Sequence, residues 1–140
     1  ILILRISNII GYKLNVKKKL HKTFVDLFYE KAKKGFIYDN KKRFKDFLSI
    51  QKFCEILVMI IKKDLRGTYN ISIGRKIYLN QIISWLNKYN KKRFKIINFN
   101  SKKNENFYLN NNKLKSKIKI KNSLIELKKD CLDLSKKLFS

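Results

Sequence analysis

The sequence of 140 residues contains no proline, four glycines and a single alanine, Ala32. The scarcity of proline and glycine argues against collagen-like repeats, flexible linkers and a β-sandwich built on many tight turns. Hydrophobic residues make up 44% of the chain and aromatic residues 13%, which is enough for a packed core and argues against wholesale disorder. The length allows one domain with one core and is too short for two full domains.

Cysteine and histidine are also scarce. Cys54 and Cys131 both lie within apolar, helix-like patterns, and neither has a metal-ligand spacing with His21, the only histidine. We therefore expect no metal site. The two cysteines are interpreted as reduced, buried thiols of a cytoplasmic protein.

Long apolar runs are missing as well. The run at residues 1–6 is interrupted by Arg5, and the run at residues 56–61 is short, so neither could span a membrane and no membrane partner is expected. No basic region precedes the first run, as one would in a signal peptide. Because the chain opens with Ile1 rather than Met, we expect a processed form or a fragment.

Acidic residues are few, and the net charge is strongly positive. Lys and Arg total 35 against 10 Asp and Glu, which gives a net charge of +25, typical of nucleic-acid binders. Only five of the basic residues are arginine, and no Arg-rich cluster, reading helix or exposed aromatic platform is evident. Residues with A/T-rich codons are abundant, so we interpret much of the lysine excess as drift in an A/T-rich genome. A basic nucleic-acid-binding module is kept as the alternative function, although nucleic acid is not the expected partner.

The hydrophobic pattern alternates between strand-like and helix-like segments. It predicts a buried strand of a parallel sheet at the start of the chain and a helix at 53–63 that is buried on most sides. Glycines are expected to end the first two helices at Gly35 and Gly67. The order indicates an α/β chain without internal repeats. Strands are predicted at 1–6, continued by Ile9-Ile10 up to Gly11, and at 36–38, 47–50, 68–73 and 94–99, and helices at 20–34, 53–63, 80–89, 113–120 and 124–138.

The last helix carries one apolar face. Its members recur at alternating spacings of three and four, which favours a terminal helix packed within the molecule over a coiled coil. A non-catalytic scaffold that uses this face to bind a partner is a further alternative. The face consists of Leu124, Leu127, Cys131, Leu134 and Leu138.

Four segments occur in an informative order. Residues 4–11 are Leu-Arg-Ile-Ser-Asn-Ile-Ile-Gly, residues 45–50 are Lys-Asp-Phe-Leu-Ser-Ile, residues 67–74 are Gly-Thr-Tyr-Asn-Ile-Ser-Ile-Gly, and the fourth segment runs from Leu109 to Leu124. They resemble the L-R-x-S-N-x-x-G, R-D-F-x-x-V, G-x-Y-N-x-x-x-G and D-x-x-K-x-x-x-L-G segments of NAD-dependent epimerases and dehydratases. These enzymes form the extended short-chain dehydrogenase/reductase family, and dTDP-4-dehydrorhamnose reductases are among the enzymes that the chain resembles.

The resemblance implies a part of a larger enzyme. Residues 1–140 would be the C-terminal, substrate-binding portion: the end of a Rossmann sheet plus a small mixed α/β domain, without the N-terminal cofactor-binding half. NAD or NADP would be bound mainly by that missing half, through a glycine-rich turn. The family's catalytic Tyr-x-x-x-Lys pair is not found before Asn8; Tyr29 and Lys33 have its spacing but follow that motif. We therefore assign no catalytic residue, and expect the chain alone to be inactive.

The resemblance also implies which residues contact ligands. Asn8 would bond the substrate's diphosphate, since an amide donates and accepts without charge; capping of the strand end is the alternative. Lys45 stands where the family has a phosphate-binding arginine, and Arg43 lies two residues earlier, so both are candidates for phosphate contact or for solvated charge. Ser7 would lie near the nicotinamide. We expect Asn8, Arg43 and Lys45 to converge on one pocket wall.

The intact enzyme would then be an NAD(P)-dependent epimerase, dehydratase or reductase of a nucleotide-linked sugar, serving surface polysaccharide synthesis in the cytoplasm. Members of the family are often dimers, so a homodimer is an open alternative. We expect Asp46 to fix a local turn or to pair with a neighbouring base, and Asn70 to tie a loop to a strand end. Trp85 is expected in the core.

Overall fold

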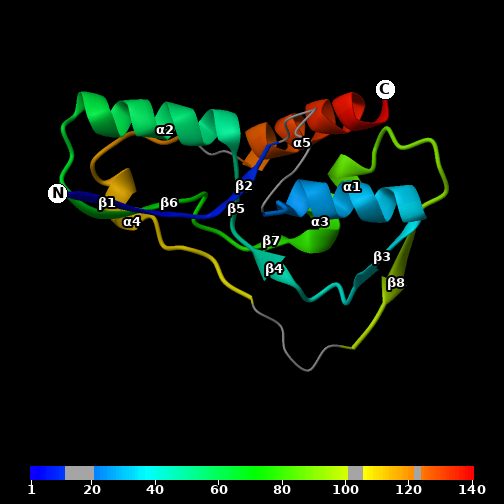
Figure 1. The fold of residues 1–140 in the computed structure, drawn as a ribbon. Coiled ribbons are helices and arrows are strands. Elements are labelled where there is room, and N and C mark those ends of the chain that lie inside the picture. Colours follow the sequence, from blue (N-terminus) through cyan, green and yellow to red (C-terminus); the bar gives the residue numbers. More distant parts are fainter. Residues whose placement is uncertain (12–20, 101–105, 122–123) are drawn as a thin grey trace.

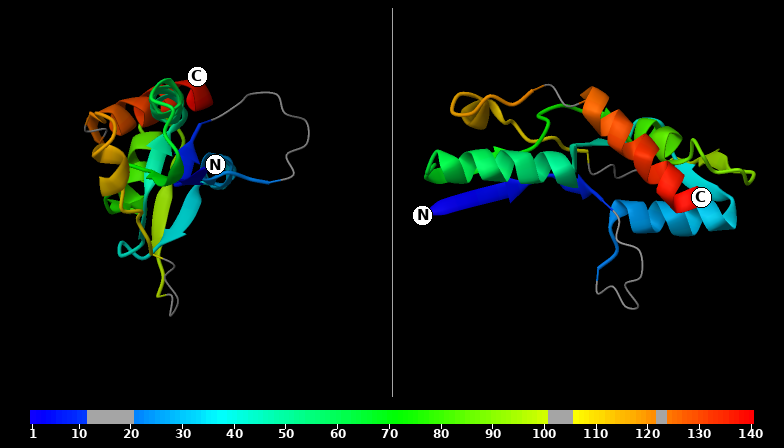
Figure 2. Two further views of the ribbon diagram at one scale, coloured as in Figure 1. Left: turned by 90° about the vertical axis from the view of Figure 1, so that its left-hand side faces the viewer. Right: turned by 90° about the horizontal axis from the view of Figure 1, so that it is seen from above.

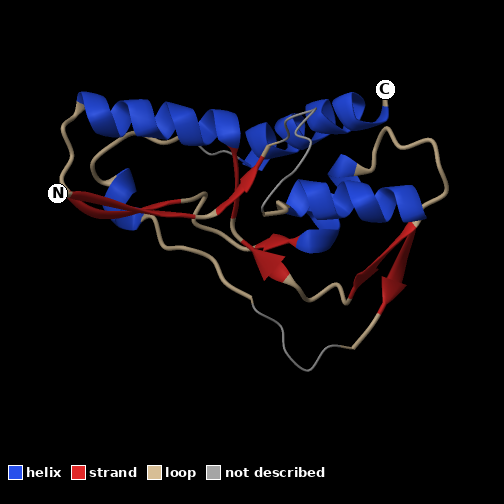
Figure 3. Ribbon diagram, in the orientation of Figure 1, coloured by secondary structure: helices blue, strands red, loops and turns tan. Residues whose placement is uncertain are grey.

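Helices and short strands alternate along the chain (Figures 1 and 3). The computed structural model describes residues 1–11, 21–100, 106–121 and 124–140. The described elements are β1 (Leu2–Ile6), β2 (Asn8–Ile10), α1 (Phe24–Lys34), β3 (Phe36–Asp39), β4 (Phe44–Lys45), β5 (Phe47–Ser49), α2 (Ile50–Lys62), β6 (Gly67–Ile71), β7 (Ile77–Tyr78), α3 (Leu79–Leu86), β8 (Lys95–Asn98), α4 (Asn112–Lys115) and α5 (Leu124–Phe139).

The strands associate in pairs, and three of the four pairs are parallel. β1 pairs with β6, β2 with β5 and β3 with β8, whereas β4 and β7 are antiparallel. The parallel pairs are joined by long connections that contain helices, as parallel pairing requires. The α/β class and the parallel pairing of the opening strand that the sequence predicts are therefore both confirmed.

Local sequence signals explain both ends of α1 and the start of α2. Thr23 and Asp26 form a reciprocal capping box at the start of α1, and Gly35 ends that helix in the left-handed conformation with φ of 85°. Ser49 caps α2 by accepting a hydrogen bond from the Lys52 amide at 3.2 Å. Part of the predicted span of α1 lies outside the described residues, and its described start is later than predicted.

The core lies between the strands and the helices. The terminal helix α5 packs against α3 and β5, and α2 packs against β2 and β5. Aromatic rings join separate elements: Phe24 meets Phe47 with ring centroids 5.2 Å apart, and Phe28 meets Phe94 at 5.9 Å. Each fully buried isoleucine, leucine or phenylalanine side chain contributes roughly 1.5–3 kcal/mol to stability. The largest such side chains are Phe28, Phe47, Leu48, Ile56, Ile60, Ile71, Ile77, Ile82, Ile83, Leu86, Leu114 and Leu127.

An ion pair joins α2 to α5. Lys52 Nζ lies 2.7 Å from Glu55 Oε2 on its own helix and 2.5 Å from Glu126 Oε2 on α5. Burial alone would lower the pKa of Lys52, but hydrogen bonds to Glu126 and Glu55 outweigh it, so the pKa is raised. The buried Lys52 therefore fixes the start of α5 against the start of α2.

The structure corrects several predictions about burial. β1 was expected to be buried, yet Ile3 is 53% exposed and Ile6 is 47% exposed. α2 was expected to be buried on most sides, yet it exposes one side and carries Cys54 on the surface; only Cys131 is a buried thiol. The apolar character of both segments is real, but no other described layer covers their outer sides. α2 also ends at Lys62, before Gly67, which instead begins β6.

The predicted terminal helix is confirmed, and its apolar face packs within the molecule, as predicted. Leu127, Cys131, Leu134 and Leu138 are all buried against the rest of the chain. The scaffold hypothesis needed this face for a partner, so it is wrong. The helix predicted at 113–120 is shorter in the structure, where α4 ends at Lys115. Among the described residues, no helix is both long and apolar enough to cross a membrane.

Candidate functional site

The chain changes its strand partner between β1 and β2. Ser7 separates the two strands, and its amide donates to the Ile71 carbonyl of the β6 strand at 3.0 Å. The next amide, that of Asn8, donates to the Asp46 carbonyl at 3.3 Å, and β2 then runs beside β5. The two successive residues are thus held by two different neighbours. This switch places the Ser-Asn motif at the point where the β1–β6 and β2–β5 pairs separate.

The side chain of Asn8 contacts the segment that carries the basic residues. Its Nδ2 donates to the Asp46 carbonyl at 3.1 Å, so the half-buried amide is fixed by the β4–β5 junction. No described residue donates to its Oδ1, which keeps the capacity to accept a hydrogen bond. Asn8 is therefore held at the junction of two strand pairs, and its contact with a ligand stays a prediction.

Lys45 and Arg43 lie on β4 and just before it. Lys45 pairs with Ile77 across the antiparallel β4–β7 ladder, and its Nζ lies 5.8 Å from the centroid of the Phe107 ring. The backbone of Arg43 is fixed at both ends: its amide donates to Asn40 Oδ1 at 3.1 Å, and its carbonyl accepts from the Leu79 amide at 3.0 Å. Both side chains are half-buried and have no ion-pair partner in the described part of the chain.

The structure therefore brings Asn8 next to the backbone of the segment that carries Lys45. It shows no direct contact among the side chains of Asn8, Arg43 and Lys45, so their convergence on one wall stays a prediction. The two cations lie in different environments. Lys45 lies over the aromatic ring of Phe107, whereas Arg43 precedes β4. Either can present positive charge to an anion.

Asp46 has a role that the sequence did not predict. Its Oδ1 accepts from the Ile73 amide at 3.1 Å, and its Oδ2 accepts from the Gly74 and Leu109 amides at 3.1 and 3.2 Å. The expected local turn or pairing with a base is therefore wrong, since the carboxylate joins segments distant in sequence. Burial raises the pKa of Asp46 above its ordinary value, although the three amide donors act in the opposite direction.

Ser7 is the predicted cofactor contact. Its side chain is buried, with 6% exposure, yet no described residue forms a hydrogen bond with its Oγ. A buried hydroxyl without a partner is unfavourable, which makes this atom a candidate for contact with a group that the chain does not supply. Because Ser7 is adjacent to Asn8, the unpaired hydroxyl and the amide oxygen lie at the same strand switch.

The segment after β8 contains asparagines whose hydrogen bonds hold the strands around the site. Asn106 Oδ1 accepts from the Phe44 amide at 3.1 Å and thereby holds the start of β4. Asn111 Nδ2 donates to the Ser72 carbonyl at 2.8 Å, and Asn70 Nδ2 donates to the Asn110 carbonyl at 2.7 Å, which confirms the predicted structural role of Asn70. The polar composition of this segment indicated a loop but not these contacts. Spacing alone could not have identified them, because the partners are far apart in sequence.

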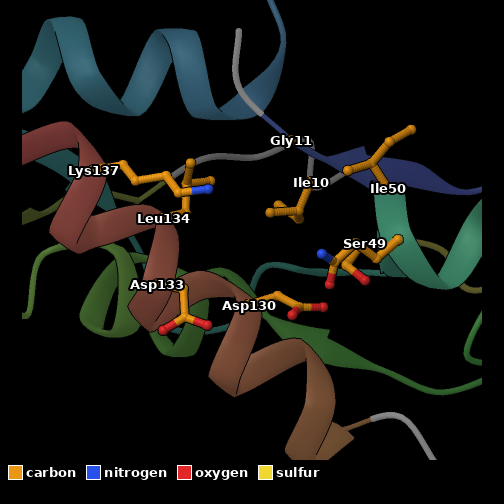
Figure 4. A pocket seen from close by; sticks show the side chains of 9 residues that line it. Ile10, Gly11, Ser49, Ile50, Asp130, Asp133, Leu134 and Lys137 are labelled. Atoms are coloured by element: carbon orange, nitrogen blue, oxygen red, sulfur yellow. The ribbon is translucent and has the colours of Figure 1, made fainter. Parts of the chain in front are cut away.

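A hollow of about 180 Å³ lies at the other end of β2 and β5 (Figure 4). It does not include Ser7, Asn8, Arg43 or Lys45. Its lining carries two carboxylates, which would oppose a diphosphate. The hollow is therefore separate from the predicted substrate contacts. It is lined by Ile10, Gly11, Ser49, Ile50, Gln51, Asp130, Asp133, Leu134 and Lys137.

Two other features can be assigned to structure. Lys33 Nζ lies 4.4 Å from the centroid of the Tyr29 ring, and that ring packs against Phe139, so this Tyr-x-x-x-Lys spacing has a packing role. Trp85 is partly buried and packs against the core, as predicted. The described residues contain no group of three or more His, Cys, Asp or Glu side chains that could hold a metal ion.

Comparisons with known proteins identify solved structures that have a similar fold. No protein-family model matches the sequence, and no curated protein matches it. Among solved structures, UDP-N-acetylglucosamine 4-epimerase from Methanobrevibacter ruminantium M1, in complex with UDP-N-acetylmuramic acid, matches with a TM-score of 0.72 and 14% identity over 96% of this chain and 44% of that chain.

Two further structures have similar scores. dTDP-glucose 4,6-dehydratase from Bacillus anthracis, in complex with NAD, matches with a TM-score of 0.63 and 16% identity over 96% of this chain and 43% of that chain. RMD from Pseudomonas aeruginosa, complexed with NADPH, matches with a TM-score of 0.68 and 13% identity over 98% of this chain and 47% of that chain. The chain thus spans less than half the length of these proteins. It has the fold of part of the NAD-dependent epimerases and dehydratases, as its four motifs predict.

Proposed function

We propose that residues 1–140 are the C-terminal, substrate-binding portion of an NAD(P)-dependent epimerase, dehydratase or reductase that acts on a nucleotide-linked sugar. The observation that carries the proposal is the strand switch, where an amide oxygen and an unpaired buried hydroxyl lie beside the segment that bears two cations. The fold shared with two sugar-nucleotide enzymes, an epimerase and a dehydratase, supports the same class of substrate.

The chemistry of the site suits a diphosphate that links a sugar to a nucleoside. Lys45 can neutralise one phosphate, and Arg43 can present a planar fork of donors to another. Asn8 can bond the sugar or the bridging oxygens without adding charge, because its amide both donates and accepts. In this arrangement the cations supply attraction and the amide supplies orientation.

The cofactor is proposed to be NAD or NADP, which supplies hydride transfer when it is bound. Ser7 fits a contact with the nicotinamide carboxamide, since its buried Oγ lacks a partner among the described residues. Most cofactor contacts are proposed to come from a second, cofactor-binding part of the enzyme. The chain alone would then bind substrate weakly and would not turn it over.

The wider setting belongs to the same proposal. An enzyme of this class in the cytoplasm would supply activated sugars for surface polysaccharides. The intact enzyme could form a homodimer, with the interface outside this chain. These points rest on the class of reaction rather than on a contact in the structure.

The proposal predicts weak binding of sugar nucleotides to the isolated chain. Titration with UDP-N-acetylglucosamine, followed by amide chemical shifts, is expected to perturb Asn8 and Lys45 first. We expect Asn8→Ala and Lys45→Ala each to weaken binding about tenfold, because each removes a hydrogen bond or charge contact worth roughly 1–3 kcal/mol. If neither substitution changes the affinity for UDP-N-acetylglucosamine, the proposed site is wrong.

Lys95→Ala is the matched control. It removes the same charge from an exposed position on β8, away from the strand switch. Uridine without phosphate should bind least, and a single-stranded RNA should not compete for the Asn8 shift at moderate salt. If RNA instead binds more tightly than the sugar nucleotide, with affinity that falls steeply with salt, the nucleic-acid alternative is favoured.

A further inference from the structure

Exposed cations gather where the C-terminal ends of α1 and α5 meet the connection between α3 and β8. Phe28 of α1 packs against Phe94 and Phe139, with ring centroids 5.9 and 6.3 Å apart. The Lys95 amide also donates to the Gly35 carbonyl at 2.9 Å. Figures 1 and 2 show this end of the molecule opposite β1 and α4. We call its exposed cations the basic cluster, which consists of Lys33, Lys34, Lys91, Lys92, Arg93 and Lys136.

The basic cluster has no acidic residue in its own segments. Residues 31–38, 88–98 and 134–140 contain neither Asp nor Glu. Helix C-termini favour cations, which accounts for Lys34 and Lys136. The same effect does not account for Lys91, Lys92 and Arg93, which lie outside the helices. Like charges held together in this way favour an anionic partner.

The two-stranded β3–β8 ribbon begins beside the basic cluster and exposes apolar side chains. Tyr38 pairs with Ile97 in the parallel register, so both lie on one face of the ribbon. Phe99 extends this face, since its ring centroid lies 6.0 Å from that of Tyr38. Tyr38 is 48% exposed, Ile97 is 38% exposed and Phe99 is 37% exposed. We call these three residues the apolar ribbon face.

A lipid surface fits both features better than a nucleic acid does. Exposed aromatic and aliphatic side chains beside lysines suit a membrane surface, where the apolar groups enter the headgroup layer and the cations contact its phosphates. Nucleic acid would need free ring faces for base stacking. Two rings near the cluster are instead covered by lysines: Lys33 Nζ lies 4.4 Å from the Tyr29 centroid, and Lys136 Nζ lies 5.2 Å from the Tyr89 centroid. The cluster also contains one arginine, Arg93, although nucleic-acid sites favour arginine.

We propose that the basic cluster and the apolar ribbon face together bind the surface of an anionic lipid bilayer. The cations contact the headgroup phosphates, and Tyr38, Ile97 and Phe99 enter the headgroup layer. The expectation of no membrane partner was based on the absence of a spanning segment, which this peripheral contact does not need. The proposal is independent of the substrate site, because neither Asn8 nor Lys45 takes part in it.

Co-sedimentation of residues 1–140 with lipid vesicles tests the proposal. Vesicles of phosphatidylcholine alone are compared with vesicles that contain equal amounts of phosphatidylcholine and phosphatidylglycerol, at about 0.1 M NaCl. The chain should bind the anionic vesicles at least about tenfold more tightly, because each lysine near an anionic surface changes the partition coefficient about fivefold. This preference should fall as the salt concentration rises.

Charge reversal within the basic cluster should weaken binding. Lys91→Glu/Lys92→Glu is expected to lower the affinity for anionic vesicles at least about tenfold. Lys115→Glu/Lys119→Glu is the matched control, since it changes the net charge equally at two exposed positions, at the end of α4 and after it. The control should lower the affinity less than about threefold, because these positions lie away from the cluster. Circular dichroism checks that each variant keeps the helix content of the wild type.

A change in the apolar ribbon face should weaken binding without a change in charge. Ile97→Ser is expected to lower the affinity for anionic vesicles about fivefold, because it removes an apolar side chain from the lipid contact. Phe99→Ser is the second variant, since Phe99 follows β8 and takes no part in the strand pairing. It should lower the affinity by a similar factor.

Several results would overturn the assignment: no preference for anionic vesicles, equal losses in the two charge-reversed variants, or unchanged binding by both apolar variants. Tighter binding of a single-stranded oligonucleotide, abolished by Lys91→Glu/Lys92→Glu, would identify nucleic acid as the occupant instead. Displacement of the vesicles by UDP-N-acetylglucosamine would assign the apolar ribbon face to the substrate and would also overturn it. Failure of the proposed function is distinguishable, because the shifts of Asn8 and Lys45 with UDP-N-acetylglucosamine are measured without vesicles.

Discussion

Asp46 illustrates how one side chain can hold a site together without taking part in its chemistry. Its carboxylate accepts three amide hydrogen bonds, from Ile73, Gly74 and Leu109, and its own carbonyl accepts the side chain of Asn8. The residue therefore links the β4–β5 junction, the end of β6 and the segment before α4. Charge-assisted hydrogen bonds of this kind are stronger than neutral ones.

Substitution of Asp46 should destabilise the chain in a graded order. Asp46→Ala leaves three amides without an acceptor, and we expect a loss of about 3 kcal/mol or more in the free energy of unfolding. Asp46→Asn keeps one oxygen but turns an NH₂ group towards a donor, so a loss of about 1–3 kcal/mol is expected. Urea denaturation measures both, and equal stability of the two variants would contradict the network.

The same residue predicts a pH dependence. The pKa of Asp46 is raised from its ordinary value of 3.8, so the folded state retains this proton to higher pH than the unfolded chain. Its contribution to stability is therefore greatest below the ordinary pKa and falls as pH rises through the raised one. The difference in stability between wild type and Asp46→Asn should shrink from about pH 4 towards neutral pH. A difference that grows over this range would show that the amide donors dominate over burial.

At the scale of elements, the first helix depends on one glycine. Gly35 ends α1 with φ of 85°, and its amide donates to the carbonyls of Ala32 and Lys31. A Cβ at this position would lie 3.2 Å from the Arg93 carbonyl oxygen. Gly35→Ala should therefore lower the free energy of unfolding by about 1–2 kcal/mol, through the strained backbone and the close contact. Thermal unfolding followed by circular dichroism measures the loss.

Asparagine at position 35 separates the two causes. It adds the same Cβ but tolerates the left-handed conformation better than alanine. Gly35→Asn should therefore be less destabilising than Gly35→Ala. Equal losses would assign the effect to the contact with Arg93 rather than to backbone strain.

The pattern of apolar residues was sufficient to predict most elements but not their environment. The opening strand, the α1 stop at Gly35 and the buried face of α5 all follow from local signals. The exposure of β1 and of the outer side of α2 could not be predicted, because periodicity shows which residues are apolar and not what covers them. The change of strand partner at Ser7 also depends on neighbours distant in sequence.

The candidate site was predictable to a similar degree. The motif order pointed to Asn8 and to the segment around Lys45, and the structure brings their backbones together. The three-way contact of Asp46 was missed because its partners are 27, 28 and 63 residues away. A single sequence carries no signal for such pairs.

At the scale of the whole molecule, charge is the dominant feature. With 35 basic and 10 acidic residues, most cations lack an acidic partner, and they repel one another in the folded state. The described ion pairs are few, and those of Lys22 with Glu30 and of Arg66 with Asp64 are at the exposed surface. Exposed pairs contribute little, so screening should weaken repulsion more than attraction.

Added salt should therefore stabilise this chain. Between about 20 mM and about 0.5 M NaCl we expect the melting temperature to rise by several degrees, with most of the rise at low concentration because the Debye length shortens steeply there. The double variant Lys91→Glu/Lys92→Glu, which lowers the net charge by four at two exposed positions, should melt higher than wild type at low salt and equally at high salt. A melting temperature that falls with salt would mean that attractive pairs dominate. A rise that continues linearly to molar salt in both proteins would point to salt exclusion from the surface rather than to relief of charge repulsion.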